Sequence, residues 1–213
     1  MEFIEKRRCV IVAAGRIPSE DVIKSRIFYD DYVIAADAGY MILKKAGIIP
    51  DLIVGDFDSS DTPENDIETI VLNPIKDCTD TEFAVKKAVE KGFKDILILG
   101  ALGGRTDHSF ANITLVAEYK DSDINITLIT ENQKIYALKN ETKSIAKADI
   151  YVSLFSFGSM CNVSTEGLFY PLSNYSLSPY SAIGVSNEIV DNTAKITVND
   201  GILLVMEVSK NTI

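Results

Sequence analysis

The chain has 213 residues, of which 46% are hydrophobic, and its formal net charge at pH 7 is −10. This length and apolar content suit one large globular domain or two small ones. Binding a polynucleotide takes clustered Lys and Arg, and crossing a membrane takes about 20 consecutive apolar residues, so the acidic, interrupted sequence predicts no nucleic-acid partner and no membrane partner.

The first 130 residues alternate short apolar runs with segments of helical periodicity. Thr79-Asp-Thr-Glu82 has the pattern of a capping box and predicts a helix that ends at Gly92. Strands that alternate with helices favour a parallel sheet with helices on its faces. The predicted strands are Cys9–Ala13, Tyr32–Ala36, Leu52–Val54, Thr69–Leu72, Ile96–Leu99 and Ile124–Thr130, and the other helices are Ser19–Phe28, Met41–Ala46 and Ser109–Tyr119.

Helical periodicity disappears after about Glu131. Short apolar runs then alternate with Asn, Ser, Gly and Pro, which predicts an all-β second half. We therefore expect two domains, residues 1–130 and 131–213. The apolar runs of the second half are Lys134–Leu138, Ile150–Phe155, Gly167–Leu172, Ala194–Val198 and Ile202–Val208.

Three cysteines, Cys9, Cys78 and Cys161, have neither CxxC nor zinc-site spacing. An odd number of such cysteines is typical of reduced thiols in a cytosolic protein. The segment from Met1 to Arg8 lacks an apolar stretch of signal-peptide length. These features predict a cytoplasmic location.

Five aspartates follow predicted strands in the first half: Asp37, Asp56, Asp58, Asp80 and Asp107. Ligands of open α/β sheets bind at the carboxyl ends of the strands, so these side chains are expected on one edge. Crowded carboxylates repel one another, and a divalent cation removes that penalty. Because Mg²⁺ prefers oxygen ligands and links acidic sites to nucleotide triphosphates, the pattern predicts a site for Mg²⁺ and a nucleotide.

Each of these features also has a structural interpretation. An Asp-x-Asp pair occurs in Asx turns and helix caps, Gly103 and Gly104 suit a turn with positive φ, and Asp80 can interact with a helix dipole. His108 is the only histidine in the chain. A lone histidine beside other polar residues is more often structural than a general base, so we assign His108 no catalytic role.

The order of several longer strings closely resembles the thiamine pyrophosphokinase family. The strings are Ala36-Asp-Ala-Gly39, Ile49-Pro-Asp-Leu-Ile-Val-Gly-Asp-Phe-Asp-Ser59, Thr79-Asp-Thr-Glu82, Leu99-Gly-Ala-Leu-Gly-Gly-Arg-Thr-Asp-His-Ser-Phe-Ala-Asn112, Gly167-Leu-Phe-Tyr-Pro-Leu172 and Ser186-Asn-Glu188. The resemblance implies a Rossmann-like domain over residues 1–130, which binds nucleotide and metal, and a β-sandwich over residues 131–213, which binds thiamine and forms a homodimer. It also implies an enzyme that transfers a pyrophosphoryl group from ATP to the hydroxyethyl oxygen of thiamine and leaves AMP.

The resemblance also implies roles for single residues. Asp56, Asp58 and Asp80 match the catalytic acids that hold Mg²⁺ and the triphosphate, and Asp80 is a candidate to take the proton of the thiamine hydroxyl. Ser186 and Asn187 correspond to residues that hydrogen-bond the aminopyrimidine of thiamine. The implied nucleotide-binding residues are Asp37, Thr81, Gly103, Gly104, Arg105 and Asp107.

Two departures from the family pattern concern these sites. Asp37-Ala-Gly-Tyr40 stands where the family usually has Asp-Gly-Gly-Ala, which puts a Cβ and a large ring where a close backbone approach is expected. Some members stack thiamine on a tryptophan, whereas this chain has none. Tyr170, Tyr175 and Tyr180 are the alternative stacking residues.

Other classes of function remain open from the residues alone. A phosphohydrolase with Asp56 as nucleophile and Asp58 as acid, or a nucleotide-sugar transferase, also places Asp-x-Asp after a strand. A non-catalytic sensor of thiamine or nucleotide is a further alternative. Release of AMP, free phosphate or a sugar product distinguishes the enzymes, and binding without AMP formation indicates the sensor.

Overall fold

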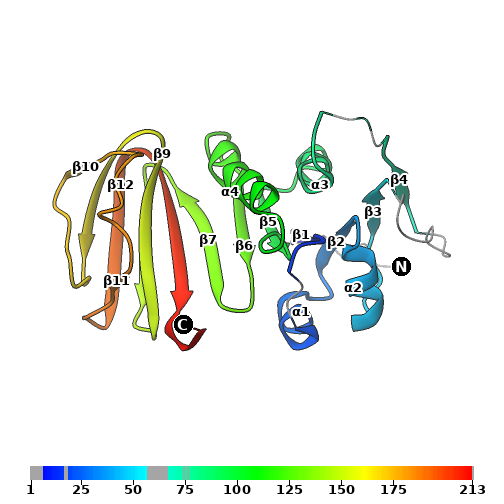
Figure 1. Cartoon of the computed structure of the whole chain (residues 1–213), viewed down its shortest axis with the longest axis horizontal. Helices are drawn as coiled ribbons and strands as arrows, with labels where there is room; N and C mark the ends of the chain where they lie inside the picture. Colours follow the sequence, from blue (N-terminus) through cyan, green and yellow to red (C-terminus); the bar gives the residue numbers. More distant parts are fainter. Residues whose placement is uncertain (1–6, 17–18, 57–66, 74, 76, 213) are drawn as a thin grey trace. The chain divides into compact units, whose positions relative to one another are not determined.

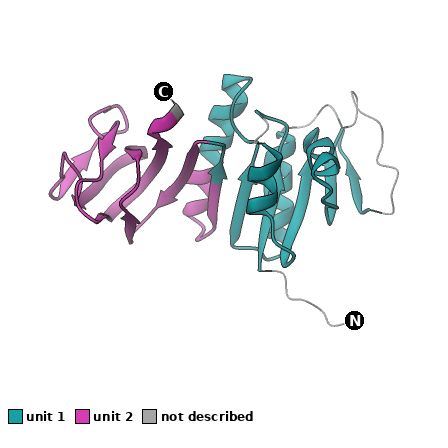
Figure 2. Cartoon of the chain, turned by 90° about the horizontal axis from the view of Figure 1, so that it is seen from below, with its two compact units in different colours: residues 1–115, 128–131 teal, residues 116–127, 132–213 magenta. Residues whose placement is uncertain are grey.

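The structure is a computed structural model that describes residues 7–16, 19–56, 67–73, 75 and 77–212 (Figure 1). The chain divides into two compact units (Figure 2). The first unit comprises residues 1–115 and 128–131, and the second comprises residues 116–127 and 132–213. Among the described residues, no helix is both long and apolar enough to cross a membrane.

A parallel sheet forms the centre of the first unit. Its strands are β1 (Arg8–Val12), β2 (Asp31–Ala36), β3 (Leu52–Gly55), β4 (Thr69–Val71) and β5 (Asp95–Leu99), and β6 (Asn125–Ile129) lies where the two units divide. The strand order is β5-β1-β2-β3-β4, with parallel pairing throughout. The chain runs outward from β1 to β4 and then returns to the other side of β1. The strand order therefore reverses between β1 and β5, which is where such sheets bind ligands.

Helices cover both faces of this sheet, as its uniformly apolar strands require. The helices are α1 (Glu20–Arg26), α2 (Gly39–Ala46), α3 (Asp80–Glu90) and α4 (Thr106–Lys120). Ile23 of α1 and Leu43 of α2 pack with Val10 and Val12 of β1 in one buried cluster. Helix α3 contacts β1, β2 and β3. Alternate residues of a strand point to opposite faces, so each strand contributes to two apolar layers.

The second unit is an antiparallel β-sandwich built on two long strands, β9 (Ile150–Glu166) and β12 (Thr193–Ser209). These strands pair along their whole length, with register shifts around Asp200. One half of β12 pairs with β7 (Gln133–Leu138) and the other half with β8 (Thr142–Ala146). The halves therefore belong to two layers, and alternate residues of both halves share one buried cluster. The shorter elements are β10 (Tyr175–Leu177), β11 (Asn187–Glu188) and the 3-10 helix η1 (Lys210–Thr212).

The predicted elements do not include β8 and β10, and they differ from the structure most clearly at three further places. The two predicted strands Ala194–Val198 and Ile202–Val208 are one strand, because Gly201 (φ 81°) continues the chain through the irregular register. The predicted strand Gly167–Leu172 is wrong, since only an isolated bridge from Leu168 to Ile189 forms there. Helix α4 begins at Thr106, three residues before its predicted start.

Candidate functional site

A cavity of about 610 Å³ opens at the carboxyl ends of the strands in the first unit. It lies where the strand order reverses between β1 and β5. The residues that line it are Ala13, Ala14, Gly15 and Arg16 after β1; Ala36 and Asp37 at the end of β2; Thr79, Asp80 and Thr81 at the start of α3; and Gly100, Ala101, Gly103, Gly104, Arg105, His108 and Asn112 after β5. Five of the six sequence-predicted nucleotide-binding residues therefore line this cavity, and they come from three segments that are far apart in the chain.

The loops after β1 and β5 are joined by backbone hydrogen bonds beyond the ends of the strands. Ala13 N donates to Leu99 O at 2.8 Å and Gly15 N donates to Gly100 O at 2.7 Å. A Cβ on Gly15 would lie 2.3 Å from Gly100 O, and a Cβ on Gly100 would lie 2.5 Å from Ala13 O. Only glycine fits at both positions, so the main chains of the two loops pack directly against each other at the cavity.

The segment after β2 places Asp37 in the cavity. Asp37 has φ 52°, and its amide donates to Val54 O at 2.8 Å. A Cβ on Gly39 would lie 1.9 Å from Val12 O, so the start of α2 packs directly against the end of β1. Two residues of this segment, Ala38 and Tyr40, depart from the usual family pattern. Ala38 is exposed, and the Tyr40 ring is buried in the core cluster.

The amino end of α3 is at the same cavity. Thr79 Oγ1 accepts a hydrogen bond from Glu82 N at 3.1 Å, which confirms the predicted cap, and the Glu82 carboxylate pairs with Lys86 at 2.6 Å. Asp80 and Thr81 follow as the first helical residues, and Thr81 is 9% exposed. Free amide groups and the helix dipole make such an end favourable for an anion.

The two glycines of the loop before α4 have different surroundings. Both have positive φ, 89° at Gly103 and 78° at Gly104. A Cβ on Gly103 would lie 2.5 Å from the Cβ of Arg16, whereas a Cβ on Gly104 would meet nothing within 4 Å. Gly103 is therefore required by packing, and Gly104 is the position at which a ligand can approach the main chain.

Arg105 and Asp107 form a two-pronged ion pair at the start of α4. Arg105 Nε donates to Asp107 Oδ1 at 3.1 Å, and Arg105 Nη2 donates to Asp107 Oδ2 at 2.6 Å. The Arg105 hydrogen bond, together with one from the backbone N–H of His108, lowers the pKa of Asp107 to about 2. Asp107 is thus charged at neutral pH and orients the Arg105 guanidinium.

The five predicted acids do not all line the cavity. Asp37 and Asp80 do, whereas Asp56, which directly follows β3, and Asp107 are absent from the lining. Asp58 lies outside the described residues. Within the described part of the chain, no group of three or more His, Cys, Asp or Glu side chains is placed to hold a metal ion.

Four residues near the cavity are not indicated as site residues by the sequence patterns. Gly15 and Arg16 lie in the loop after β1, and a glycine in the loop that follows a buried strand is the signal that could have indicated them. Ser109 and Asn112 lie on α4 within the Leu99–Asn112 string and hydrogen-bond to the glycine loop. Those bonds depend on the folded loop, so no local pattern predicts them.

In the second unit, the residues predicted to bind thiamine lie in and before β11. Ser186 has φ 57°, and its amide donates to the Ser153 hydroxyl at 3.0 Å. Asn187 is only 6% exposed. Its Oδ1 accepts from Tyr170 N at 3.0 Å and from Glu188 N at 2.9 Å, and its Nδ2 donates to Tyr170 O at 2.8 Å. The Asn187 amide therefore fastens the Gly167–Leu172 segment to β11.

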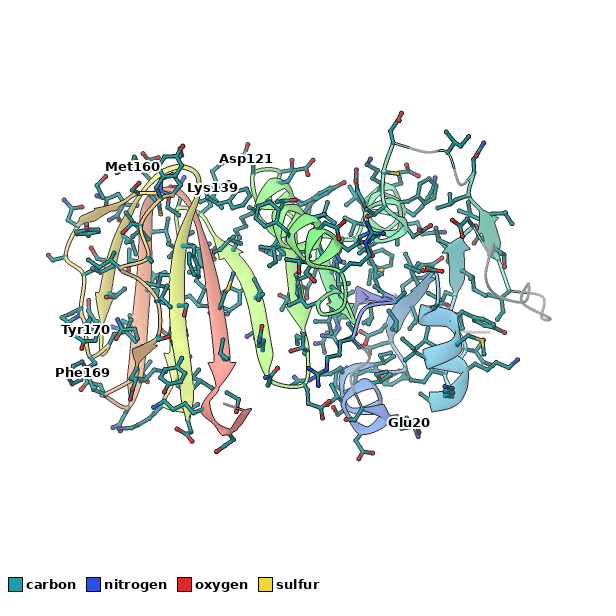
Figure 3. All side chains as sticks on the ribbon, viewed as in Figure 1. Glu20, Asp121, Lys139, Met160, Phe169 and Tyr170 are labelled. Carbon is teal, nitrogen blue, oxygen red and sulfur yellow. The ribbon has the colours of Figure 1, made fainter. Side chains whose placement is uncertain are left out.

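The side chains beside this pair are aromatic and exposed. Phe169 and Tyr170 are more than 60% exposed, and their rings are in edge-to-face contact with centroids 4.8 Å apart (Figure 3). Glu188, the third residue of the Ser-Asn-Glu string, accepts from Lys210 Nζ at 2.8 Å and so connects β11 to η1. Of the three candidate stacking residues, Tyr170 is the one whose backbone N–H and C=O are both hydrogen-bonded to the Asn187 side chain.

Taken together, the first unit has the features of the Rossmann-like class of phosphate-binding proteins. Its cavity lies where the strand order reverses, a helix amino end and a glycine loop border it, and an arginine stands beside the loop.

Comparisons with known proteins identify the family within this class. The family model described as the catalytic domain of thiamin pyrophosphokinase matches residues 24–128, and the one described as its vitamin B1 binding domain matches residues 136–203. A thiamine pyrophosphokinase of Bacillus subtilis is 32% identical over 182 residues, which is 81% of this chain and 85% of the relative. The chain belongs to the thiamine pyrophosphokinase family, and the resemblance seen in its sequence is confirmed.

Solved structures support the same assignment. A thiamine pyrophosphokinase structure from Bacillus subtilis matches with a TM-score of 0.85 and 28% identity, over 96% of this chain and all of the other. A thiamin pyrophosphokinase structure from Geobacillus thermodenitrificans matches with a TM-score of 0.83 and 27% identity, over 96% and 98% of the two chains. The predicted fold class, a Rossmann-like α/β region followed by a β-sandwich, is confirmed.

Proposed function

We propose that this chain is an enzyme that transfers a pyrophosphoryl group from ATP to the hydroxyethyl oxygen of thiamine and releases AMP. The observation that carries the proposal is the cavity of the first unit, which joins Asp37, Asp80, Thr81 and the glycine loop in a chain that belongs to the thiamine pyrophosphokinase family. The β-sandwich supports the acceptor half of the reaction, because the vitamin B1 binding model matches it.

The donor set near the cavity fits Mg²⁺. This ion usually takes one or two protein carboxylates and completes its shell with water and substrate phosphates, so it does not need three clustered protein ligands. Asp80 and Asp37 offer carboxylate oxygens inside the cavity, and Asp56 follows the neighbouring strand β3. We assign the metal to Asp56, Asp58 and Asp80. When bound there, Mg²⁺ would neutralise negative charge on the phosphates.

Arg105 and the amino end of α3 bind the phosphates in this proposal. The Arg105 fork is engaged by Asp107 and is therefore already oriented for a second planar or tetrahedral acceptor. Gly104 lets a phosphate approach the main chain, and Thr81 lies at the start of a helix whose dipole favours negative charge. Positioning of donor and acceptor then contributes much of the rate acceleration.

The acceptor is bound by the second unit. Ser186 and Asn187 serve the aminopyrimidine, and Tyr170 offers the aromatic face for stacking. Tyr170 is 66% exposed, which leaves its ring accessible to a ligand. At the reacting end, the carboxylate of Asp80 takes the proton of the thiamine hydroxyl as the oxygen attacks the β-phosphorus of ATP and AMP leaves.

We further propose that the enzyme is a homodimer that works in the cytoplasm. Apolar side chains near Ser186, namely Phe169, Ile183, Val185 and Val190, are exposed and support an interface on the sandwich. In the dimer, the sandwich of one subunit presents thiamine to the nucleotide held by its partner. Free thiols at Cys9, Cys78 and Cys161 suit a reducing compartment.

The test is to incubate the purified chain with ATP, Mg²⁺ and thiamine and to separate the nucleotides. AMP that forms only when thiamine is present supports the proposal. Free phosphate without AMP would instead indicate a phosphohydrolase. Turnover of a nucleotide sugar would indicate a sugar transferase, and binding of thiamine or ATP without any AMP would indicate a sensor.

A further inference from the structure

The turn from Gly103 to Arg105 is held by a hydroxyl group that is not among the residues lining the cavity. Ser109 Oγ accepts a hydrogen bond from Gly103 N at 3.1 Å and donates one to Arg105 O at 3.1 Å. One hydroxyl therefore bridges the first and last residues of the turn, with Gly104 between them. Ser109 itself is half-buried on the second turn of α4.

The residues before this turn are anchored independently of Ser109. Asn112, which is 6% exposed, donates from Nδ2 to Ala101 O at 2.7 Å. Arg16 N donates to Leu102 O at 2.8 Å. Both bonds end before Gly103, whereas Gly103, Gly104 and Arg105 are exposed. Arg105 O also accepts a hydrogen bond from Ser109 N at 3.1 Å, so the part of the turn that depends on the Ser109 hydroxyl is the attachment of the Gly103 amide.

This arrangement bears on how the turn can bind a ligand. The Gly103 amide is engaged by Ser109, so the approach to the main chain is at Gly104, where a Cβ would meet open space. Two adjacent glycines with positive φ lose much conformational freedom when they are ordered. A turn that is ordered before binding avoids that cost at the moment of association.

We propose that Ser109 is a positioning residue for the nucleotide: it orders the turn that presents Gly104 and Arg105, and it sets the affinity for the nucleotide phosphates without contacting them. This inference rests on the proposed function, in which the cavity binds MgATP. It goes beyond that function in assigning a role to a side chain outside the cavity lining. The effect is specific to the nucleotide, since Ser109 holds no part of the second unit in this proposal.

The experiment compares Ser109→Ala with Ser109→Thr, which keeps a hydroxyl at the same position. Ser25→Ala is the matched control, because Ser25 is also an α-helical serine whose hydroxyl donates to the main chain, to Val22 O at 2.8 Å, but outside the cavity lining. For Ser109→Ala we expect the KM for ATP to rise about tenfold, equivalent to about 1.4 kcal/mol. The KM for thiamine and the Tm should remain close to those of the wild type, and Ser109→Thr should recover most of the loss.

Equilibrium binding of MgATP is measured in parallel by calorimetry. If the wild type binds MgATP but forms no AMP, the proposed function is wrong. The inference about Ser109 is then still tested by whether Ser109→Ala lowers the affinity for MgATP. An unchanged affinity for MgATP in Ser109→Ala would overturn the inference. Equal increases in the two KM values, failure of Ser109→Thr to recover, a similar loss in Ser25→Ala, or a wild type that does not bind MgATP would overturn it as well.

Discussion

The side-chain amide of Asn187 connects strand β11 to the Gly167–Leu172 segment, and its removal should affect stability and thiamine binding together. Asn187→Ala eliminates hydrogen bonds to Tyr170 N, Tyr170 O and Glu188 N. At about 1 kcal/mol net for each bond, the loss is at most about 3 kcal/mol. Water can reach the freed groups of the exposed Tyr170 segment, so we expect the free energy of unfolding to fall by about 2 kcal/mol.

Asn187→Asp separates the accepting bonds from the donating one. The carboxylate can still accept from Tyr170 N and Glu188 N, but it cannot donate to Tyr170 O. Because position 187 is only 6% exposed, Asn187→Asp also buries a charge and sets a carboxylate oxygen against Tyr170 O, so its loss of stability should be at least as large as that of Asn187→Ala. Urea unfolding of both variants, followed by circular dichroism, measures the difference.

Steady-state kinetics on the same variants tests the link to the acceptor. If Asn187 positions Tyr170 for thiamine, Asn187→Ala should raise the KM for thiamine more than the KM for ATP. A larger increase in the KM for ATP would instead indicate that Asn187 affects nucleotide binding. Unchanged stability of Asn187→Ala would refute the reasoning from hydrogen bonds.

The remaining predictions concern the first unit. Asp58→Asn should abolish AMP formation and leave the Tm unchanged, because the site and not the core needs the charge; an active variant would contradict the metal assignment. Gly103→Ala should lower the Tm more than Gly104→Ala, since only the former meets a neighbouring side chain, while Gly104→Ala should mainly raise the KM for ATP; equal effects on Tm would contradict this difference. The folded-state pKa of Asp107 is about 2, which is below its ordinary value of 3.8. The stabilising pair with Arg105 should therefore be fully present above about pH 4 and be lost as the pH falls through 2. NMR titration of the Asp107 carboxyl in an otherwise folded protein should show this lowered pKa.

Several features of the protein were determined by local sequence. The apolar run of β1 is buried throughout from Cys9 to Val12, and Thr79 caps α3 as its pattern predicts. Both follow from interactions within a few residues, either periodic burial of side chains or one bond from a cap to the third amide of a helix. The family strings and the change from helical to strand-like periodicity near Glu131 likewise required no coordinates.

Tertiary structure alone decided features that depend on residues distant in the chain. Gly201 looks like a turn residue in sequence, yet it continues β12 because β9 pairs on both sides of the irregularity. Gly167–Leu172 has the composition of a strand, but Asn187 takes the backbone groups of Tyr170 that a ladder would use. In both cases the deciding hydrogen-bond partner lies 17 or more residues away. The periodicity of the sequence indicates which side chains are buried. The hydrogen-bond partners of main-chain groups, in contrast, depend on which distant segments lie side by side in the folded chain.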